Sequence, residues 1–139
     1  MRKFAYVMLA TLGFFSLPAQ ADVDGAKQFV KQYQALVKGV NPTYVLNADA
    51  GRAFYIKKHT VKGKQVACTD CHGDNPAAVG KHSQTGKKIA SLSPTVNPKR
   101  FSNLKKTEET FDIHCNDILE RNCTSQEKGD YIVYVLSTK

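Results

Sequence analysis

The chain has 139 residues and a mass of 15.4 kDa, which is enough for one compact domain. Hydrophobic residues make up 42% of it and charged residues 23%, which excludes a disordered chain. Four cysteines are too few for a disulfide scaffold, and nine glycines and five prolines are too few for a fibrous protein. Twenty Lys and Arg residues against 12 Asp and Glu residues give a basic chain with a net charge of +8.

Residues 1–21 have the three parts of a secretory signal peptide: a positively charged start, an apolar centre over residues 4–17, and the cleavage triplet Ala-Gln-Ala. The apolar centre, about 14 residues long, is shorter than the roughly 20 residues that span a bilayer. We expect export to the periplasm with cleavage after Ala21. Cleavage removes both methionines and the charges of Arg2 and Lys3, which leaves 118 residues with a net charge of +6. No second apolar segment follows, so we expect no membrane anchor in the mature protein.

Four helices are predicted along the mature chain. The first spans residues 22–38, where apolar side chains recur at helical spacing, and it ends at a segment containing Gly, Asn and Pro. The second begins at Asn47 or Asp49, and the third covers roughly residues 107–120. The fourth begins at Thr124, where the sequence Thr-Ser-Gln-Glu is typical of a capping box.

Two loops separate these helices: a basic loop over residues 57–64 and a much longer one over residues 73–98. No alternating pattern typical of strands extends beyond a few residues, so we predict an all-α fold. So long a loop is unusual in a small domain, and we expect a group other than protein to organise it. The predicted division is a signal peptide, an N-terminal helical extension over residues 22–46, and a main domain over residues 47–139.

The sequence Cys68-Thr69-Asp70-Cys71-His72 matches Cys-x-x-Cys-His, the attachment motif of c-type haem. In this motif both thiols bond to the vinyl groups of the haem, and the adjacent histidine binds the iron. A thioredoxin-like dithiol needs a strand before it and a helix after it, and it does not require the histidine. A zinc site needs a second ligand pair, and the spacing of Cys115 and Cys123 differs from that of a Cys-x-x-Cys knuckle. The motif therefore predicts a cytochrome c domain with one covalent haem c, attached at Cys68 and Cys71 and with His72 as proximal iron ligand.

The other two cysteines, Cys115 and Cys123, are even in number and belong to a chain that we expect to be exported. A disulfide between them is therefore the first expectation, and two free buried thiols are the alternative. The bond would connect the third predicted helix to the fourth. Closing so short a loop contributes roughly 2–3 kcal/mol to stability in the chain-entropy model.

The second axial position of the iron has no methionine available, although many c-type electron carriers use one. The remaining candidates are His59, His82, His114, an Asn, a Lys, or no protein ligand. His59 and His82 lie in polar segments, and we expect both to be solvated. His114 lies on an apolar helical face, so we predict that it is the distal ligand or a pocket residue, and a hydrogen-bonded core histidine is the alternative. The apolar residues of this face are Phe111, Cys115 and Ile118.

The proximal ligand needs a partner for its second ring nitrogen. A metal-binding imidazole usually donates its other N–H group to a carbonyl or a carboxylate. The loop that contains Leu92, Pro94 and Val96 is a plausible source, and we predict that Pro94 provides the acceptor for His72.

Many cations surround the motif in sequence. Most of them are expected to be solvated, but a ring of lysines around an exposed haem edge would steer an acidic redox partner, with an attraction that salt weakens. Nucleic acid is not an expected partner after export. The cations are Lys57, Lys58, Lys62, Lys64, Lys81, Lys87, Lys88, Lys99, Arg100, Lys105 and Lys106.

Two stretches of the chain resemble the small monohaem SHP-type cytochromes c. They are GKKIASLSPTVNPKRFSN, from Gly86 to Asn103, and HCNDILERNCTSQEKGD, from His114 to Asp130. The resemblance covers about residues 48–139 and implies the fold of a class I cytochrome c, with helices wrapped around one covalent haem. It also implies a dihaem cytochrome as electron donor. In that family an asparagine before the first disulfide cysteine binds the iron and leaves on reduction, so that oxygen or nitric oxide binds.

In this chain His114 stands where that family has the asparagine. Imidazole is a much stronger iron ligand than a carboxamide, so we hypothesise His72/His114 ligation in both redox states. The predicted function is single-electron transfer rather than enzymatic catalysis. The alternative is a protein that binds a diatomic gas after its distal ligand leaves. No acid–base cluster is evident, because Asp112 and Asp117 lie off the apolar face.

Overall fold

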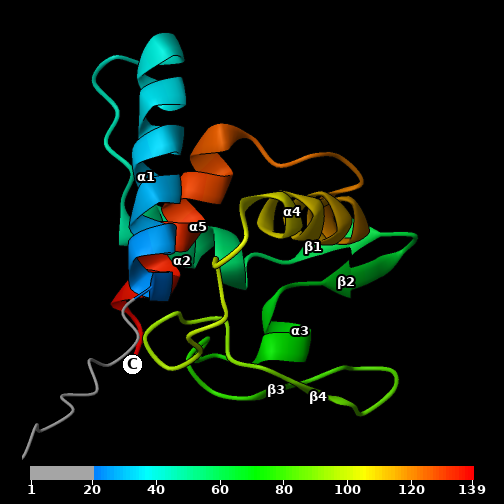
Figure 1. The fold of residues 1–139 in the computed structure, drawn as a ribbon. Helices are drawn as coiled ribbons and strands as arrows, with labels where there is room; N and C mark the ends of the chain where they lie inside the picture. The colour runs from blue at the N-terminus through cyan, green and yellow to red at the C-terminus, as the bar shows by residue number, and fades with distance from the viewer. Residues whose placement is uncertain (1–20) are drawn as a thin grey trace, which may run out of the picture.

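The computed structural model describes residues 21–139, so the predicted signal peptide lies outside the described residues except for Ala21. Within this range, no helix has the length and apolar character needed to span a membrane. The helices are α1 (Ala21–Val40), α2 (Ala48–Ile56), α3 (Thr69–His72), α4 (Leu104–Leu119) and α5 (Ser125–Ser137) (Figure 1). The strands are β1 (His59–Val61), β2 (Lys64–Val66), β3 (Gly80–Lys81) and β4 (Lys88–Ile89).

The C-terminal helix α5 is the centre of the fold, because α1 and α2 both pack closely against it. The crossing of α2 and α5 is tight enough to require glycine at position 51. A Cβ atom there would lie 2.0 Å from the carbonyl oxygen of Asp130. The rings of Tyr55 and Tyr134 pack beside this crossing, with centroids 5.6 Å apart.

The first helix buries one face against α5, as its spacing predicts. The buried side chains are Ala26, Phe29, Tyr33 and Val37. The helix runs two residues beyond the predicted end, to Val40. It therefore shares one core with α5, while the division of the chain at residue 46 stays a prediction.

The helices begin where their capping residues lie. Asn47 caps α2 through its side chain, and Thr124 and Glu127 form the predicted capping box of α5. Asn103 accepts a hydrogen bond from the backbone N–H of Lys106, so α4 begins three residues before the predicted start. This helix ends at Glu120, which adopts a left-handed conformation with φ 55°.

The expectation that residues 57–64 form only a loop was wrong. They contribute to an antiparallel hairpin of β1 and β2, which turns at Lys62 and Gly63, both with positive φ. The strands have only three residues each, too few for an alternating pattern to be visible in the sequence. The long loop also contains a strand pair, β3 with β4, and is otherwise irregular as predicted.

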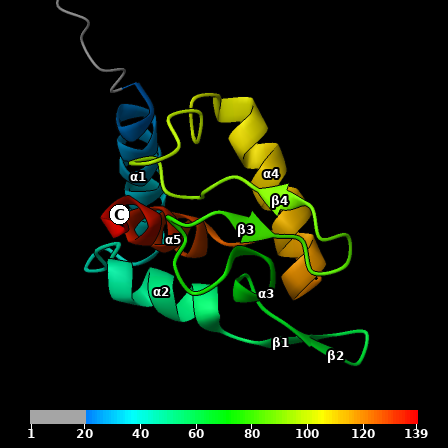
Figure 2. The same cartoon turned by 90° about the horizontal axis from the view of Figure 1, so that it is seen from below.

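The fourth helix joins the core of α1, α2 and α5 only along one side, through Phe111 and Cys115. Figure 2 shows the short α3 between α2 and the C-terminal part of α4. The β1–β2 hairpin contacts α4. This arrangement leaves a space between α4 and the rest of the molecule, which the candidate site occupies.

Candidate functional site

A cavity with mainly apolar walls, open to solvent at its mouth, lies between α4, α3, β1 and the loop before α4. Apolar walls with a few polar groups are typical of cofactor sites. The predicted face of α4 forms one wall, through Phe111, His114 and Ile118. Cys68 and His72 of the Cys-x-x-Cys-His motif form the opposite wall.

The motif folds into the single helical turn α3, which sets the direction of its side chains. The carboxylate of Asp70 accepts a hydrogen bond from the backbone N–H of Ala67 at 2.8 Å, and the N–H of His72 donates to the carbonyl of Cys68 at 3.0 Å. The thiol of Cys68 lines the cavity, and burial raises its pKa to about 11. The sulfur of Cys71 lies 3.4 Å from the backbone nitrogen of Ser83.

The two cysteines of the motif are free thiols in the described part of the chain. Only Cys68 is among the residues that line the cavity, and Cys71 is partly buried beside the β3–β4 segment. This arrangement is consistent with two attachment points on one side of a bound haem. That haem is attached at Cys68 and Cys71 stays a prediction.

The imidazoles of His72 and His114 face each other across the cavity. Their ring centroids lie 6.4 Å apart, and their planes are nearly perpendicular at 87°. An imidazole nitrogen binds a transition metal at about 2 Å, and the ring centroid lies roughly 1 Å further back, so two rings on opposite sides of one ion are roughly 6 Å apart. The observed separation therefore fits one iron ion between the two histidines.

The surroundings of both imidazoles lower their pKa values, which favours the neutral form that binds metals. Burial lowers the pKa of His72 to about 4, with smaller contributions from His114 and the cation of Arg100. Burial and Arg100 also lower the pKa of His114, which Asp117 raises to a lesser extent.

The structure corrects the expectation that His59 is solvated. Its side chain lines the cavity, and its buried Nε2 atom has no hydrogen-bond partner among residues 21–139. Burial and the nearby Lys57 lower its pKa. Sequence spacing did not reveal this position, because it results from the packing of the hairpin against α4. His82 instead closes a turn, where its Nδ1 accepts hydrogen bonds from the backbone N–H groups of Gln84 and Thr85.

Arg100, grouped above with the surface cations, also lines the cavity. Its Nε atom is buried without a partner in the described chain, and its guanidinium lies 5.2 Å from the ring centroid of Phe101. A buried N–H donor without a partner is costly, and the strongest partner for an arginine N–H is a carboxylate. Haem has two propionate carboxylates, so Arg100 fits a bound haem.

The structure neither supports nor contradicts the predicted hydrogen bond from His72 to the carbonyl of Pro94. Pro94 is buried in the loop, but its neighbour Leu92 is the residue that lines the cavity. No hydrogen bond joins Pro94 to His72 within the described residues, and the role of Pro94 stays a prediction.

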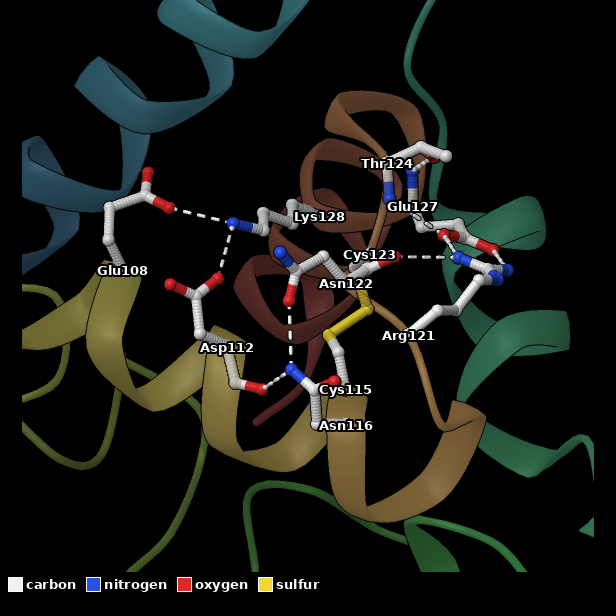
Figure 3. The surroundings of a disulfide bond; sticks show 10 residues. All are labelled: Glu108, Asp112, Cys115, Asn116, Arg121, Asn122, Cys123, Thr124, Glu127 and Lys128. Atoms are coloured by element: carbon white, nitrogen blue, oxygen red, sulfur yellow. Dashed lines mark hydrogen bonds and ion pairs between the residues drawn. A yellow bond between two sulfur atoms is a disulfide. The ribbon is translucent and has the colours of Figure 1, made fainter. Parts of the chain in front are cut away.

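The predicted disulfide between Cys115 and Cys123 is confirmed, with Cα atoms 5.6 Å apart. It connects α4 to the residue that precedes the capping box of α5, as Figure 3 shows. Cys115 also lines the cavity and directly follows His114. The bond therefore restrains α4 beside His114.

The chain matches the family described as "Domain of unknown function (DUF1924)" over residues 41–135. It is 42% identical to cytochrome c'' of Methylophilus methylotrophus over 133 residues, which are 94% of this chain and 92% of that protein. It is 31% identical to the cytochrome c-type protein SHP of Cereibacter sphaeroides over 119 residues, which are 85% of this chain and 88% of that protein.

Solved structures of the same two cytochromes are similar to this chain. The crystal structure of oxidized cytochrome c'' from Methylophilus methylotrophus is similar with a TM-score of 0.80 and 41% identity, over 85% of this chain and 98% of that one. A solution structure of the same cytochrome, whose description concerns haem-ligand detachment, has a TM-score of 0.77, 42% identity, and coverage of 84% and 95%. Oxidized SHP, described as an oxygen-binding cytochrome c, has a TM-score of 0.70, 30% identity, and coverage of 79% and 94%.

Proposed function

We propose that this chain, which belongs to the DUF1924 family, is a periplasmic electron carrier with His72 and His114 as axial iron ligands. The chain is homologous to the small monohaem cytochromes c'' and SHP, whose cofactor is covalent haem c. The observation that carries this proposal is the pair of neutral imidazoles facing each other at 6.4 Å. Two nitrogen ligands leave no open position on the iron for a substrate. This favours electron transfer over catalysis.

When bound, haem c supplies a one-electron redox centre. The residues of the chain have separate tasks around it. Cys68 and Cys71 would provide the thiols for attachment, and His72 and His114 would bind the iron. The apolar wall formed by α4 would limit the access of water, and the guanidinium of Arg100 would pair with a propionate.

Absorption spectra of the oxidised and reduced holoprotein test this assignment. We expect six-coordinate, low-spin spectra in both states and slow, incomplete binding of carbon monoxide to the reduced form. The variant His114→Ala should become high-spin, while His59→Ala should keep the low-spin spectrum of the wild type. A five-coordinate, high-spin spectrum of the reduced wild type would contradict ligation in both states.

A second candidate function is the binding of a diatomic gas after His114 leaves the reduced iron. It is favoured by the position of α4 to one side of α1, α2 and α5 in Figure 2. The descriptions of the two relatives, an oxygen-binding cytochrome c and a cytochrome with haem-ligand detachment, point the same way. Fast and complete binding of carbon monoxide to the reduced protein is the outcome that distinguishes this function.

We further propose an acidic redox partner, such as a dihaem cytochrome c. The support is the set of exposed lysines close to the site in sequence, including Lys81, Lys87 and Lys88 beside the β3–β4 strands. Cations around a redox centre accelerate the encounter with an anionic partner.

A further inference from the structure

The way α4 is held decides where His114 lies. Among the described helices, α5 packs most extensively against α2 and α1, and α4 takes no part in this packing. Instead, α4 reaches α5 through a few side chains on one stripe of its surface. These are Glu108, Phe111, Asp112 and Cys115, which lie on neighbouring turns on one side of α4.

Towards the N-terminal half of α4, this connection is a cluster of ion pairs around Lys128 of α5. The ammonium of Lys128 donates to Glu108 at 2.8 Å and lies 3.5 Å from a carboxylate oxygen of Asp112, as Figure 3 shows. Glu108 also accepts a hydrogen bond from the hydroxyl of Tyr33, so the cluster extends to α1. The side chain of Lys128 is only 11% exposed. We call these residues the Lys128 clamp.

The clamp is connected to the cavity through Phe111. The ammonium of Lys128 lies 5.5 Å from the centroid of this ring, which also packs edge-to-face against Tyr33 and Tyr131. Phe111 forms part of the cavity wall, and His114 follows on the same face of α4. A displacement of the clamp therefore moves the helical turn that precedes His114.

The disulfide is the second connection, at the C-terminal half of α4. It attaches Cys115, the neighbour of His114, to Cys123. Together with the packing of Phe111, the clamp limits how far α4 can turn about the disulfide. The clamp therefore contributes to how far His114 reaches into the cavity.

We propose that Lys128, with Glu108 and Asp112, positions α4 so that His114 stays on the haem iron; this rests on the proposed His72/His114 ligation. Lys128 is a positioning residue, because it acts on the iron only through α4. Without the clamp, α4 pivots about the disulfide and His114 leaves the iron more often.

The chain contains a matched control on the same helix. Lys105 forms an ion pair with Glu109 at 3.8 Å, with side chains 87% and 60% exposed, and this pair connects no other element. Exposed pairs of this kind contribute little, whereas a largely buried, charge-assisted hydrogen bond is much stronger. Lys105→Met therefore makes the same chemical change as Lys128→Met without releasing α4.

Cyanide binding to the oxidised holoprotein measures how often His114 leaves, because at saturating cyanide the binding rate equals the rate of departure. We expect Lys128→Met to bind cyanide about tenfold faster than the wild type, as the loss of a charged hydrogen bond implies. Lys105→Met should stay within about twofold of the wild type, and Lys128→Arg should recover most of the slow rate. Equal rates for Lys128→Met and Lys105→Met overturn the proposal.

Hydrogen exchange of the backbone amides gives a readout that does not depend on ligation. In Lys128→Met, the amides of α4 should exchange about tenfold faster than in Lys105→Met, while those of α2 and α5 remain unchanged. If the spectrum of the wild type excludes His114 as an iron ligand, the proposed function fails. If the amides of α4 exchange equally fast in Lys128→Met and Lys105→Met, the proposed role of the Lys128 clamp is overturned. Glu108→Gln serves as the second variant if Lys128→Met fails to fold.

Discussion

Arg100 shows how one side chain affects the redox site without binding the iron. Its cation is close enough to His72 and His114 to lower the pKa of both imidazoles. Because the oxidised iron carries one more positive charge than the reduced iron, the same cation favours the reduced state. Arg100 is thus expected to raise the reduction potential and to pair with a propionate at the same time.

The substitution Arg100→Met should therefore lower the reduction potential by roughly 50 mV, where 59 mV corresponds to a tenfold change in a one-electron equilibrium. Electrochemistry of the holoprotein measures this change. Lys99→Met is the control, because Lys99 is exposed and does not line the cavity. An equal shift in both variants would show that net charge alone is responsible.

At the scale of elements, the fold depends on how closely α2 approaches α5. The contact at Gly51 involves backbone atoms of Asp130, which do not move aside as a flexible side chain does. The carboxylate of Asp130 also accepts hydrogen bonds from the hydroxyl of Tyr44 and the backbone N–H of Asn47. The start of α2 is therefore fixed to α5 by a tight crossing and by a buried acid.

The substitution Gly51→Ala should reduce the free energy of unfolding by roughly 3 kcal/mol, because a new Cβ atom forces the two helices apart. Urea unfolding followed by circular dichroism measures the loss. Gly39→Ala is the matched control, since no atom lies within 4 Å of its Cβ position, and it should stabilise α1 by about 0.5 kcal/mol. A similar effect of the two substitutions would mean that the crossing tolerates separation.

At the scale of the whole molecule, net charge governs the encounter with a partner. The chain carries +8 with its first 21 residues and +6 without them, and the two haem propionates lower this value towards +4. The remaining excess is positive, so the long-range field attracts anionic proteins.

The rate of electron exchange with an acidic redox protein should fall about tenfold as ionic strength rises from about 0.01 to 0.2 M. The reason is that added salt shortens the range over which the opposite charges attract each other. Stopped-flow mixing at several salt concentrations measures this dependence. Exchange with an uncharged small reductant should change little over the same range. If the rate with the protein partner does not depend on ionic strength, electrostatic docking is contradicted.

Local features of the chain could be predicted because neighbouring residues determine them. The helices follow from apolar spacing and from capping residues such as Thr124, and the short strands β1 to β4 were missed because they have too few residues to show a period. The pairing of Cys115 with Cys123 was predicted from number and compartment alone, and the structure confirms it.

The sequence by itself therefore determined the haem motif at Cys68–His72, the four long helices, the disulfide, and the apolar face that carries His114. Only the tertiary structure decided that His114 faces His72, that His59 and Arg100 line the same cavity, and that Lys128 holds α4. The physical reason is that motifs and helical faces depend on residues within a few positions of each other. The cavity and the clamp depend on contacts between elements far apart in the chain, which the packing of the helices alone brings together.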